Sequence, residues 1–257
     1  MRYLVLSDIH ANDVALEAVL AHARDKSWQR VVFLGDAVGY YPDPEPVVQR
    51  LRGLEPDVAI VGNHDAMLLE LNGVAQDDET RRMAHADTIV STVVRDHLER
   101  LSPASLDFLA ALKKRVVCDG WEATHGALHD TWAYLSTLPK ARQSAPLLET
   151  SVCFVGHTHV PAIYASVDTP NGEIWRTVAF RGEQGSYRIP PRARVFVNPG
   201  SVGQPRDGVP LASYALFDAE TRTVEVFRVA FDIAEVQRRV RAAGYKEALA
   251  ARLDVGR

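Results

Sequence analysis

Five short polar motifs occur in this chain, each at the point where an apolar run ends. They contain carboxylates, an amide and imidazoles, which are the groups that divalent cations prefer as ligands. Five of the nine histidines fall inside them. In chain order the motifs are Asp8-Ile9-His10, Gly35-Asp36, Gly62-Asn63-His64-Asp65, His125-Gly126 and Gly156-His157-Thr158-His159. A random scatter would not place such residues repeatedly at strand ends, so we interpret them as one metal site built from several loops.

The spacing within the motifs indicates two metal ions. Asp8 and His10 share a direction, because side chains at i and i+2 of an extended segment lie on the same side, and His157 and His159 repeat that spacing. The carboxylate of Asp36 has two oxygens and can bridge two cations. The candidate ligands are Asp8, His10, Asp36, Asn63, His125, His157 and His159. Seven donors are too many for one four-coordinate zinc ion, which predicts two ions that share Asp36.

Five further residues are candidates for catalysis or substrate binding. His64 is not needed as a ligand and could protonate a leaving oxygen, while Asp65 could orient its ring. Arg206, in a loop rich in glycine and proline, could hold a phosphate, with an ordinary salt bridge as an equal alternative. Tyr40 could stack on a nucleobase, although a structural role is the commoner one for such a tyrosine. Asn12 is a candidate substrate ligand, and either Asn12 or Asp13 is available as a helix N-cap.

The elements that must position these residues follow from the apolar pattern. Short β-branched runs lie at residues 4–6, 31–34, 59–61, 116–118 and 152–155. Residues 14–20 and 46–51 have helical spacing and lie between the first three runs. Strands that alternate with helices predict a parallel sheet, and ligands of such sheets gather beyond the carboxyl ends of the strands. The motifs occupy that edge.

The rest of the chain changes character twice. Residues 66–114 predict two or three helices that form a cap beside the site, and His22, His85 and His97 are expected on helix surfaces. The second half predicts consecutive strands and a final helix over residues 234–253. The predicted strands are 162–165, 174–180, 194–197, 214–218 and 223–229. Strands without intervening helices indicate a second, antiparallel sheet packed on the first, within a single domain of residues 1–257.

The ordered set of motifs resembles the calcineurin-like metallophosphoesterase family, in its branch of small bacterial and archaeal phosphodiesterases, over residues 5 to about 210. The resemblance implies an α+β fold: a four-layer α-β-β-α sandwich of two mixed sheets. It also implies in-line attack on phosphorus by a hydroxide that bridges two ions. One ion would be held by Asp8, His10, Asp36 and His159, and the other by Asp36, Asn63, His125 and His157. After Asp36 the chain lacks the Asp and Arg of the Ser/Thr protein phosphatase branch, which disfavours protein dephosphorylation.

Composition limits the partners. A net charge of −4 offers no basic field for tracking long nucleic acid. Cys118 and Cys153 lie in apolar runs and suggest buried thiols, not disulfides. The chain begins directly with a strand that leads into the first motif, and no apolar stretch reaches the length of a membrane span. We therefore expect a cytoplasmic enzyme without a membrane partner; the oligomeric state is left open.

The leading functional hypothesis is a binuclear-metal-dependent phosphoesterase that cleaves phosphodiester or phosphoanhydride bonds of small nucleotides, such as cyclic nucleotides or dinucleoside polyphosphates. Manganese is the first expectation for mixed His and carboxylate donors, with iron, zinc, nickel and magnesium as alternatives. A phosphomonoesterase acting on phosphoproteins or small metabolites is the second hypothesis. A non-catalytic binding scaffold is the third, and it predicts lost ligands or a missing His64, neither of which the sequence has.

Overall fold

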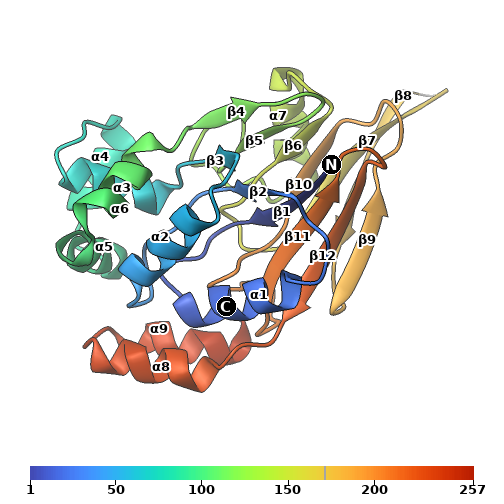
Figure 1. Ribbon diagram of the computed structural model, residues 1–257. Coiled ribbons are helices and arrows are strands. Elements are labelled where there is room, and N and C mark those ends of the chain that lie inside the picture. The colour runs from blue at the N-terminus through green and yellow to red at the C-terminus, as the bar shows by residue number, and fades with distance from the viewer. Residues whose placement is uncertain (171) are drawn as a thin grey trace.

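Two six-stranded mixed sheets pack face to face in the computed structural model, which describes residues 1–170 and 172–257 (Figure 1). The first sheet has the order β3-β2-β1-β11-β12-β9. Its strands are β1 (Arg2–Leu6), β2 (Arg30–Phe33), β3 (Val58–Ala59), β9 (Gln184–Arg188), β11 (Ala212–Asp218) and β12 (Thr223–Val229). β1, β2 and β3 run parallel, as the alternation of strands and helices predicts, and the other three pair antiparallel.

The second sheet has the order β4-β5-β6-β10-β7-β8. Its strands are β4 (Arg115–Val117), β5 (Glu122–Thr124), β6 (Val152–Phe154), β7 (Ala162–Thr169), β8 (Gly172–Ala179) and β10 (Val195–Asn198). β5, β6 and β10 are parallel, and β4, β7 and β8 are antiparallel to their neighbours. Each sheet is therefore mixed. β5 and β9 are absent from the predicted strands because neither has a continuous apolar run.

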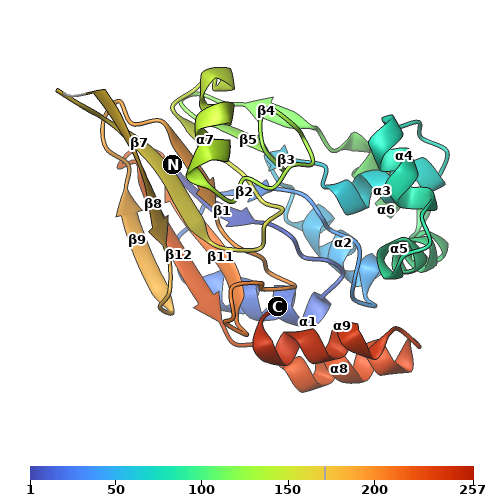
Figure 2. The ribbon, with the colours of Figure 1, turned by 180° about the vertical axis from the view of Figure 1, so that it is seen from behind.

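Helices cover the two outer faces. α1 (Asp13–Ala23) and α2 (Pro44–Gly53) share an apolar cluster with the first sheet, and α7 (Leu138–Ser144), followed by the short turn η1 (Ala145–Leu147), packs on the second (Figure 2). On β1 the alternation is visible, since Leu4 and Leu6 face the helices while Val5 faces the other sheet. This is the expected four-layer α-β-β-α sandwich.

Aromatic rings fill the space between the sheets. Trp121 meets Phe154 edge-on at 5.6 Å between ring centres, and Phe154 lies 5.0 Å from Phe217. These rings come from both sheets, so they join the layers.

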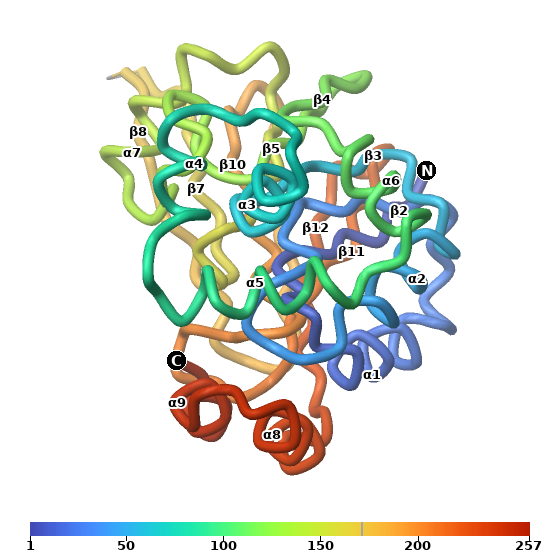
Figure 3. Tube along the Cα trace, turned by 90° about the vertical axis from the view of Figure 1, so that its left-hand side faces the viewer, coloured from blue at the N-terminus to red at the C-terminus, as the bar shows by residue number. Residues whose placement is uncertain are grey.

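Four helices lie between β3 and β4, where two or three were predicted. They are α3 (Asn63–Leu71), α4 (Asp78–His85), α5 (Ile89–Arg100) and α6 (Pro103–Ala111). Figure 1 shows them gathered at one end of the sheets, and Figure 3 views the molecule from that side. Side chains of Asp77, Thr88 and Ser102 accept hydrogen bonds from backbone N–H groups three residues on, which explains where three of these helices begin. Their apolar residues belong to the same cluster as those of α1 and α2.

The C-terminal segment differs from the single predicted helix over 234–253. It forms α8 (Ile233–Ala242), α9 (Glu247–Ala251) and the 3-10 helix η2 (Arg252–Val255). Gly244 has φ of +71° between α8 and α9, a left-handed conformation that ends a helix. Within the described part of the chain, no helix is both long and apolar enough to cross a membrane.

Candidate metal centre

All seven predicted ligands come together at one edge of the sandwich. Each comes from a loop or helix start that follows a strand: β1, β2, β3, β5 or β6. Two groups of donor atoms converge, and every member is buried: Asp8, His10, Asp36 and His159 form the first, and Asp36, His125 and His157 the second. Asp36 belongs to both groups, as the bridging role requires.

The acceptor atoms of the first group face one another in a way that suits a bound cation. His10 Nδ1 lies 3.0 Å from the Val38 carbonyl and His159 Nδ1 lies 2.6 Å from the Gln204 carbonyl, so each ring donates its proton there. The two remaining nitrogens, both Nε2, then point lone pairs at each other across 3.0 Å. Asp8 Oδ1 is 3.3 Å from His159 Nε2. Acceptors that face one another in a buried site need a positive charge between them, so these residues fit a divalent ion.

In the second group, too, each histidine donates one ring N–H to a backbone carbonyl and keeps its other nitrogen free to bind a metal ion. His125 Nδ1 donates to the Leu34 carbonyl at 2.7 Å, which leaves its Nε2 as a bare acceptor. That nitrogen lies 3.4 Å from Asp36 Oδ2 and 3.3 Å from Asn63 Oδ1. His157 donates from Nε2 to the Trp132 carbonyl at 2.9 Å, so its Nδ1 is the nitrogen left for a ligand. Asn63 thus adds its amide oxygen beside the second group.

Backbone strain is concentrated at these residues. Asp8, His10, Asp36, His157 and His159 all have φ between 53° and 67°, in the left-handed region that few side-chain-bearing residues adopt. Each such residue costs on the order of 1 kcal/mol, which the fold must offset elsewhere. These backbone conformations occur in the tight loops whose side chains converge on the two donor groups.

Two glycines make those loops possible. A Cβ on the glycine before Asp36, Gly35, would lie 2.6 Å from the backbone nitrogen of Gly62, and one on Gly156 would lie 2.1 Å from Ser7 Oγ. Gly35 thus allows a close approach between its own loop and the loop of Gly62. Only residues without side chains let the loops meet at this distance.

Electrostatics of the site follow from burial and proximity. Burial would raise the pKa of Asp8 and of Asp36, but the surrounding histidines hold both below the ordinary value. Burial opposes charge on His125 too, yet Asp36 and Asp8 raise its pKa to about 9. A cation bound at Asp36 would take the place of that proton, because a histidine must be neutral to act as a ligand.

His64 lines the pocket beside the two groups without joining them. Its ring centre lies 4.8 Å from those of His10 and Tyr40, and a Cβ on Gly39 would lie 2.2 Å from its Nδ1. That nitrogen is buried and has no hydrogen-bond partner among the described residues. Burial, opposed by Asp36 and aided by Arg206, lowers the pKa of His64 to about 4.

Asp65 has a different task from the one predicted. Its carboxylate accepts hydrogen bonds from the N–H groups of Asp36, Ala37, Val38 and Gly62, at 2.8 to 3.3 Å. These bonds use both oxygens, and none goes to the neighbouring His64 ring. Asp65 therefore fixes the loop that carries Asp36 and does not orient the histidine.

Asn12 also proves structural. Its Oδ1 accepts from the Ala15 N–H at 3.1 Å, which caps α1, and its Nδ2 donates to the Gly203 carbonyl at 2.8 Å. The side chain is buried and is not part of the pocket wall. These contacts give no support to substrate binding by Asn12, whereas its role as N-cap is confirmed.

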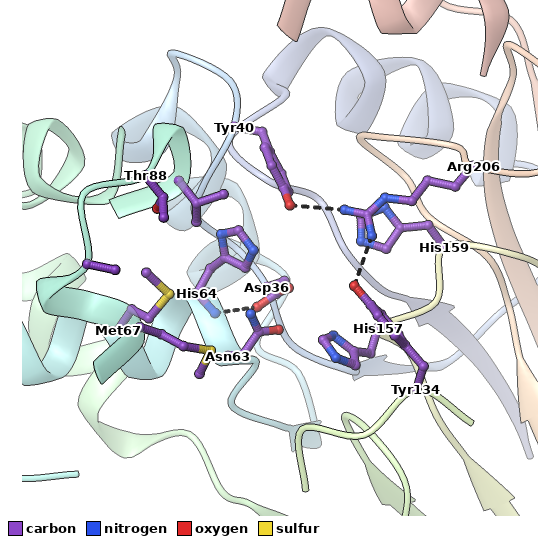
Figure 4. A pocket seen from close by; sticks show the side chains of 13 residues that line it. Asp36, Tyr40, Asn63, His64, Met67, Thr88, Tyr134, His157, His159 and Arg206 are labelled. Atoms are coloured by element: carbon purple, nitrogen blue, oxygen red, sulfur yellow. Dashed lines mark hydrogen bonds between the residues drawn. The ribbon is translucent and has the colours of Figure 1, made fainter. Parts of the chain in front are cut away.

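Arg206 lies at the opposite side of the pocket from α3, between two tyrosines (Figure 4). It donates to the hydroxyls of Tyr40 at 3.1 Å and Tyr134 at 3.3 Å, and to Gln204 Oε1. Within residues 1–170 and 172–257, no carboxylate lies within 4 Å of its guanidinium group, so the salt-bridge alternative does not apply. The pocket that these residues help to line has a volume of about 250 Å³.

Three residues of the site were missed. Tyr134 stacks on His157 at 4.1 Å between ring centres, and the buried Gln204 anchors both His159 and Arg206. His97, expected on a helix surface, is fully buried and accepts the Gly39 N–H at 3.1 Å. Tyr134 follows the His125 motif by nine positions, which no short motif could reveal, while Gln204 stands in the loop that drew attention to Arg206.

Comparisons with known proteins agree with this geometry. Residues 1–222 match the model of the calcineurin-like phosphoesterase superfamily domain. An uncharacterized protein of Methanocaldococcus jannaschii is 30% identical over 254 residues, which are 98% of this chain and 97% of the relative.

Solved structures give the same result. The crystal structure of a metallophosphoesterase from Sphaerobacter thermophilus is 33% identical with a TM-score of 0.82, and all of both chains is covered. A hypothetical protein from Pyrococcus horikoshii OT3, at 20% identity, shares the fold with a TM-score of 0.76 over 100% of this chain and 98% of the other. The chain belongs to the calcineurin-like phosphoesterase superfamily and is a metal-dependent phosphoesterase.

Proposed function

We propose that the enzyme hydrolyses phosphodiester or phosphoanhydride bonds of small nucleotides, with two divalent ions, Mn²⁺ in the first instance, held by the seven predicted ligands. The observation that carries the proposal is the uncompensated charge of Arg206 beside the two donor groups. A cation held by neutral tyrosine hydroxyls suits an anionic group of the substrate that does not react, such as a second phosphate.

The surroundings of Arg206 could accommodate a substrate that extends beyond the reacting phosphoryl group in a second direction. On its far side is a second hollow of about 330 Å³, which shares Tyr134 and Arg206 with the metal pocket and adds Thr158 and Tyr164. An anionic or polar arm could pass from the metal pocket over the guanidinium group into this hollow. Tyr40 holds Arg206 in place through its hydroxyl, which supports the structural role that the sequence favoured over nucleobase stacking.

The protein's own groups have distinct roles in this proposal. When bound, the two ions supply charge that neutralises the phosphoryl oxygens and makes water a better nucleophile. Arg206 orients the non-reacting oxygens. His64 is the candidate proton donor to the leaving oxygen, and the negative charge of a bound phosphoester favours its protonated form against the effect of burial. α3 to α6 are proposed as the cap that shapes access.

A phosphomonoesterase is the second candidate, since the metal groups would serve either ester. The discriminating experiment is a screen of the Mn²⁺-loaded protein against phosphomonoesters, cyclic nucleotides and dinucleoside polyphosphates. We expect the highest kcat/KM on a nucleotide diester or anhydride. Higher kcat/KM on monoesters throughout would refute the proposal.

A variant sharpens the screen. Arg206→Ala should raise KM for a dinucleoside polyphosphate far more than for methyl p-nitrophenyl phosphate, because only the former has further phosphates for the guanidinium group. Arg181→Ala, a change at an exposed arginine outside the site, is the matched control. Equal effects of Arg206→Ala on both substrates would show that Arg206 does not bind a second phosphate.

We further propose a cytoplasmic location, because Cys118 and Cys153 are free thiols and disulfides are rare in that compartment.

A further inference from the structure

The metal pocket has two ends of opposite chemistry. Arg206 and Tyr134 stand at one end, while Met67 and Thr88 lie on the other side of His64 (Figure 4). The second end, which we call the cap end, is formed by Met67, Met83, Ala86 and Val90. These four residues and the neighbouring Thr88 include no charged side chain, so the cap end suits an apolar group better than a phosphate.

The cap end is built from the same helix that starts at the metal centre. Met67 follows Asn63 by four residues on α3 and so lies on the same face of that helix. Met83 is on α4, Ala86 is in the connection to α5, and Val90 is in the first turn of α5. Three helices thus converge to place apolar side chains next to the metal ligands.

Core packing does not account for all of this lining. Met67 is buried, but Met83, Ala86 and Val90 remain partly open to solvent. Covering them with an apolar surface would remove that area from water, which is favourable at about 25 cal/mol per Å². Methionine side chains adapt to flat rings and make favourable contacts between sulfur and aromatic groups. The geometry therefore suits a planar ring better than a second charged group.

We propose that the cap end binds a planar aromatic arm of the substrate, a nucleobase or an aryl group, joined to the phosphoryl group that reacts. This inference rests on the proposed function, because that function places the reacting phosphate over the two donor groups. It adds a specificity determinant: Met83 and its neighbours select esters by the apolar arm, whereas Arg206 selects them by charge.

The test compares three methyl phosphodiesters whose second arm is ethyl, phenyl or 5′-adenosyl. The Mn²⁺-loaded wild type and Met83→Ser are assayed for kcat and KM by product chromatography. Dividing each variant value by the wild-type value removes the different intrinsic reactivities. We expect Met83→Ser to lower kcat/KM for the two aromatic esters about tenfold more than for the ethyl ester, mostly through KM. Loss on the adenosyl ester alone would identify the ring as a nucleobase.

The matched control is Ile89→Ser. Ile89 is an exposed apolar residue next to the same pocket, but it lines the neighbouring crevice with Tyr245. This variant should leave all three ratios unchanged. Equal losses on the three esters in Met83→Ser would mean that Met83 only supports the cap helices, and the inference would be overturned.

A binding measurement tests whether the cap end binds an aromatic group, independently of catalysis. Phenylphosphonate and methylphosphonate are titrated into the Mn²⁺-loaded protein by calorimetry. We expect phenylphosphonate to bind about tenfold more tightly in the wild type and the gap to close in Met83→Ser. No gap in the wild type would refute the apolar subsite. Failure of the wild type on all three diesters would instead remove diester hydrolysis from the proposed function and leave only the anhydrides, while the phosphonate gap would still report on the cap end.

Discussion

His97 should make the stability of this protein depend on pH in the mildly acidic range. The ring is buried on α5, with Nδ1 bonded to the Gly39 N–H. Burial lowers its pKa from 6.5 to about 3, helped by Arg100 and His64 and opposed by Asp96. Because the folded pKa lies below the unfolded one, the unfolded chain takes up the proton first as the pH falls. The stabilisation is present above pH 6.5 and is lost progressively toward pH 3.

The size of the effect follows from those two values. At pH 5 a histidine with a pKa of 6.5 is almost fully protonated in the unfolded chain, and one with a pKa of about 3 is almost fully neutral in the fold. Each pH unit in this range then costs about 1.4 kcal/mol. From pH 7 to pH 5 the contribution of His97 alone is about 2 kcal/mol.

The measurement is urea unfolding of the wild type and of His97→Gln at pH 5 and 7, with Mn²⁺ at one fixed concentration. His97→Gln keeps a hydrogen-bond acceptor but cannot be protonated. The free energy of unfolding of the wild type should fall by about 2 kcal/mol more than that of the variant. His85→Gln, at an exposed position of α4, should behave as wild type. Parallel pH profiles for wild type and His97→Gln would refute the reasoning.

Three further predictions concern the metal centre. Asp36→Asn should weaken both sites together, because Asp36 is common to the two groups; elemental analysis that shows one ion retained at full occupancy would contradict a shared ligand. Chelation should abolish activity and lower Tm, since an ion at 100 times its Kd stabilises the fold by about 2.7 kcal/mol; an unchanged Tm in calorimetry would argue against bound metal. His64→Ala should lose about 10² to 10⁴-fold in rate on an alkyl leaving group but less on p-nitrophenolate, with metal content unchanged; equal losses in the two kinetic assays would exclude the acid role.

The sequence determined the donor set and the sheet edge that carries it. Strands, helices and motifs alternate within short stretches of sequence, and local rules govern each of them. The apolar run Leu4 to Leu6 predicts a buried strand, Asn12 or Asp13 can cap the helix that follows, and a motif after a parallel strand lies at the carboxyl end of that strand. The order of motifs was enough to predict the family and the four layers. The sequence signals for these features lie within short stretches of the chain, although the donors themselves meet from distant positions.

Only the tertiary structure decided what the polar residues around the donors do. Asp65 was expected to act on His64, yet it binds the backbone of a loop that lies 29 residues away in sequence. His97 was expected on a helix surface because it lies outside every motif, yet it is buried and accepts a hydrogen bond from Gly39, 58 residues away. Tyr134 and Arg206, 72 residues apart, meet over the same pocket. Such contacts depend on how loops from different strands pack, and no local pattern records them.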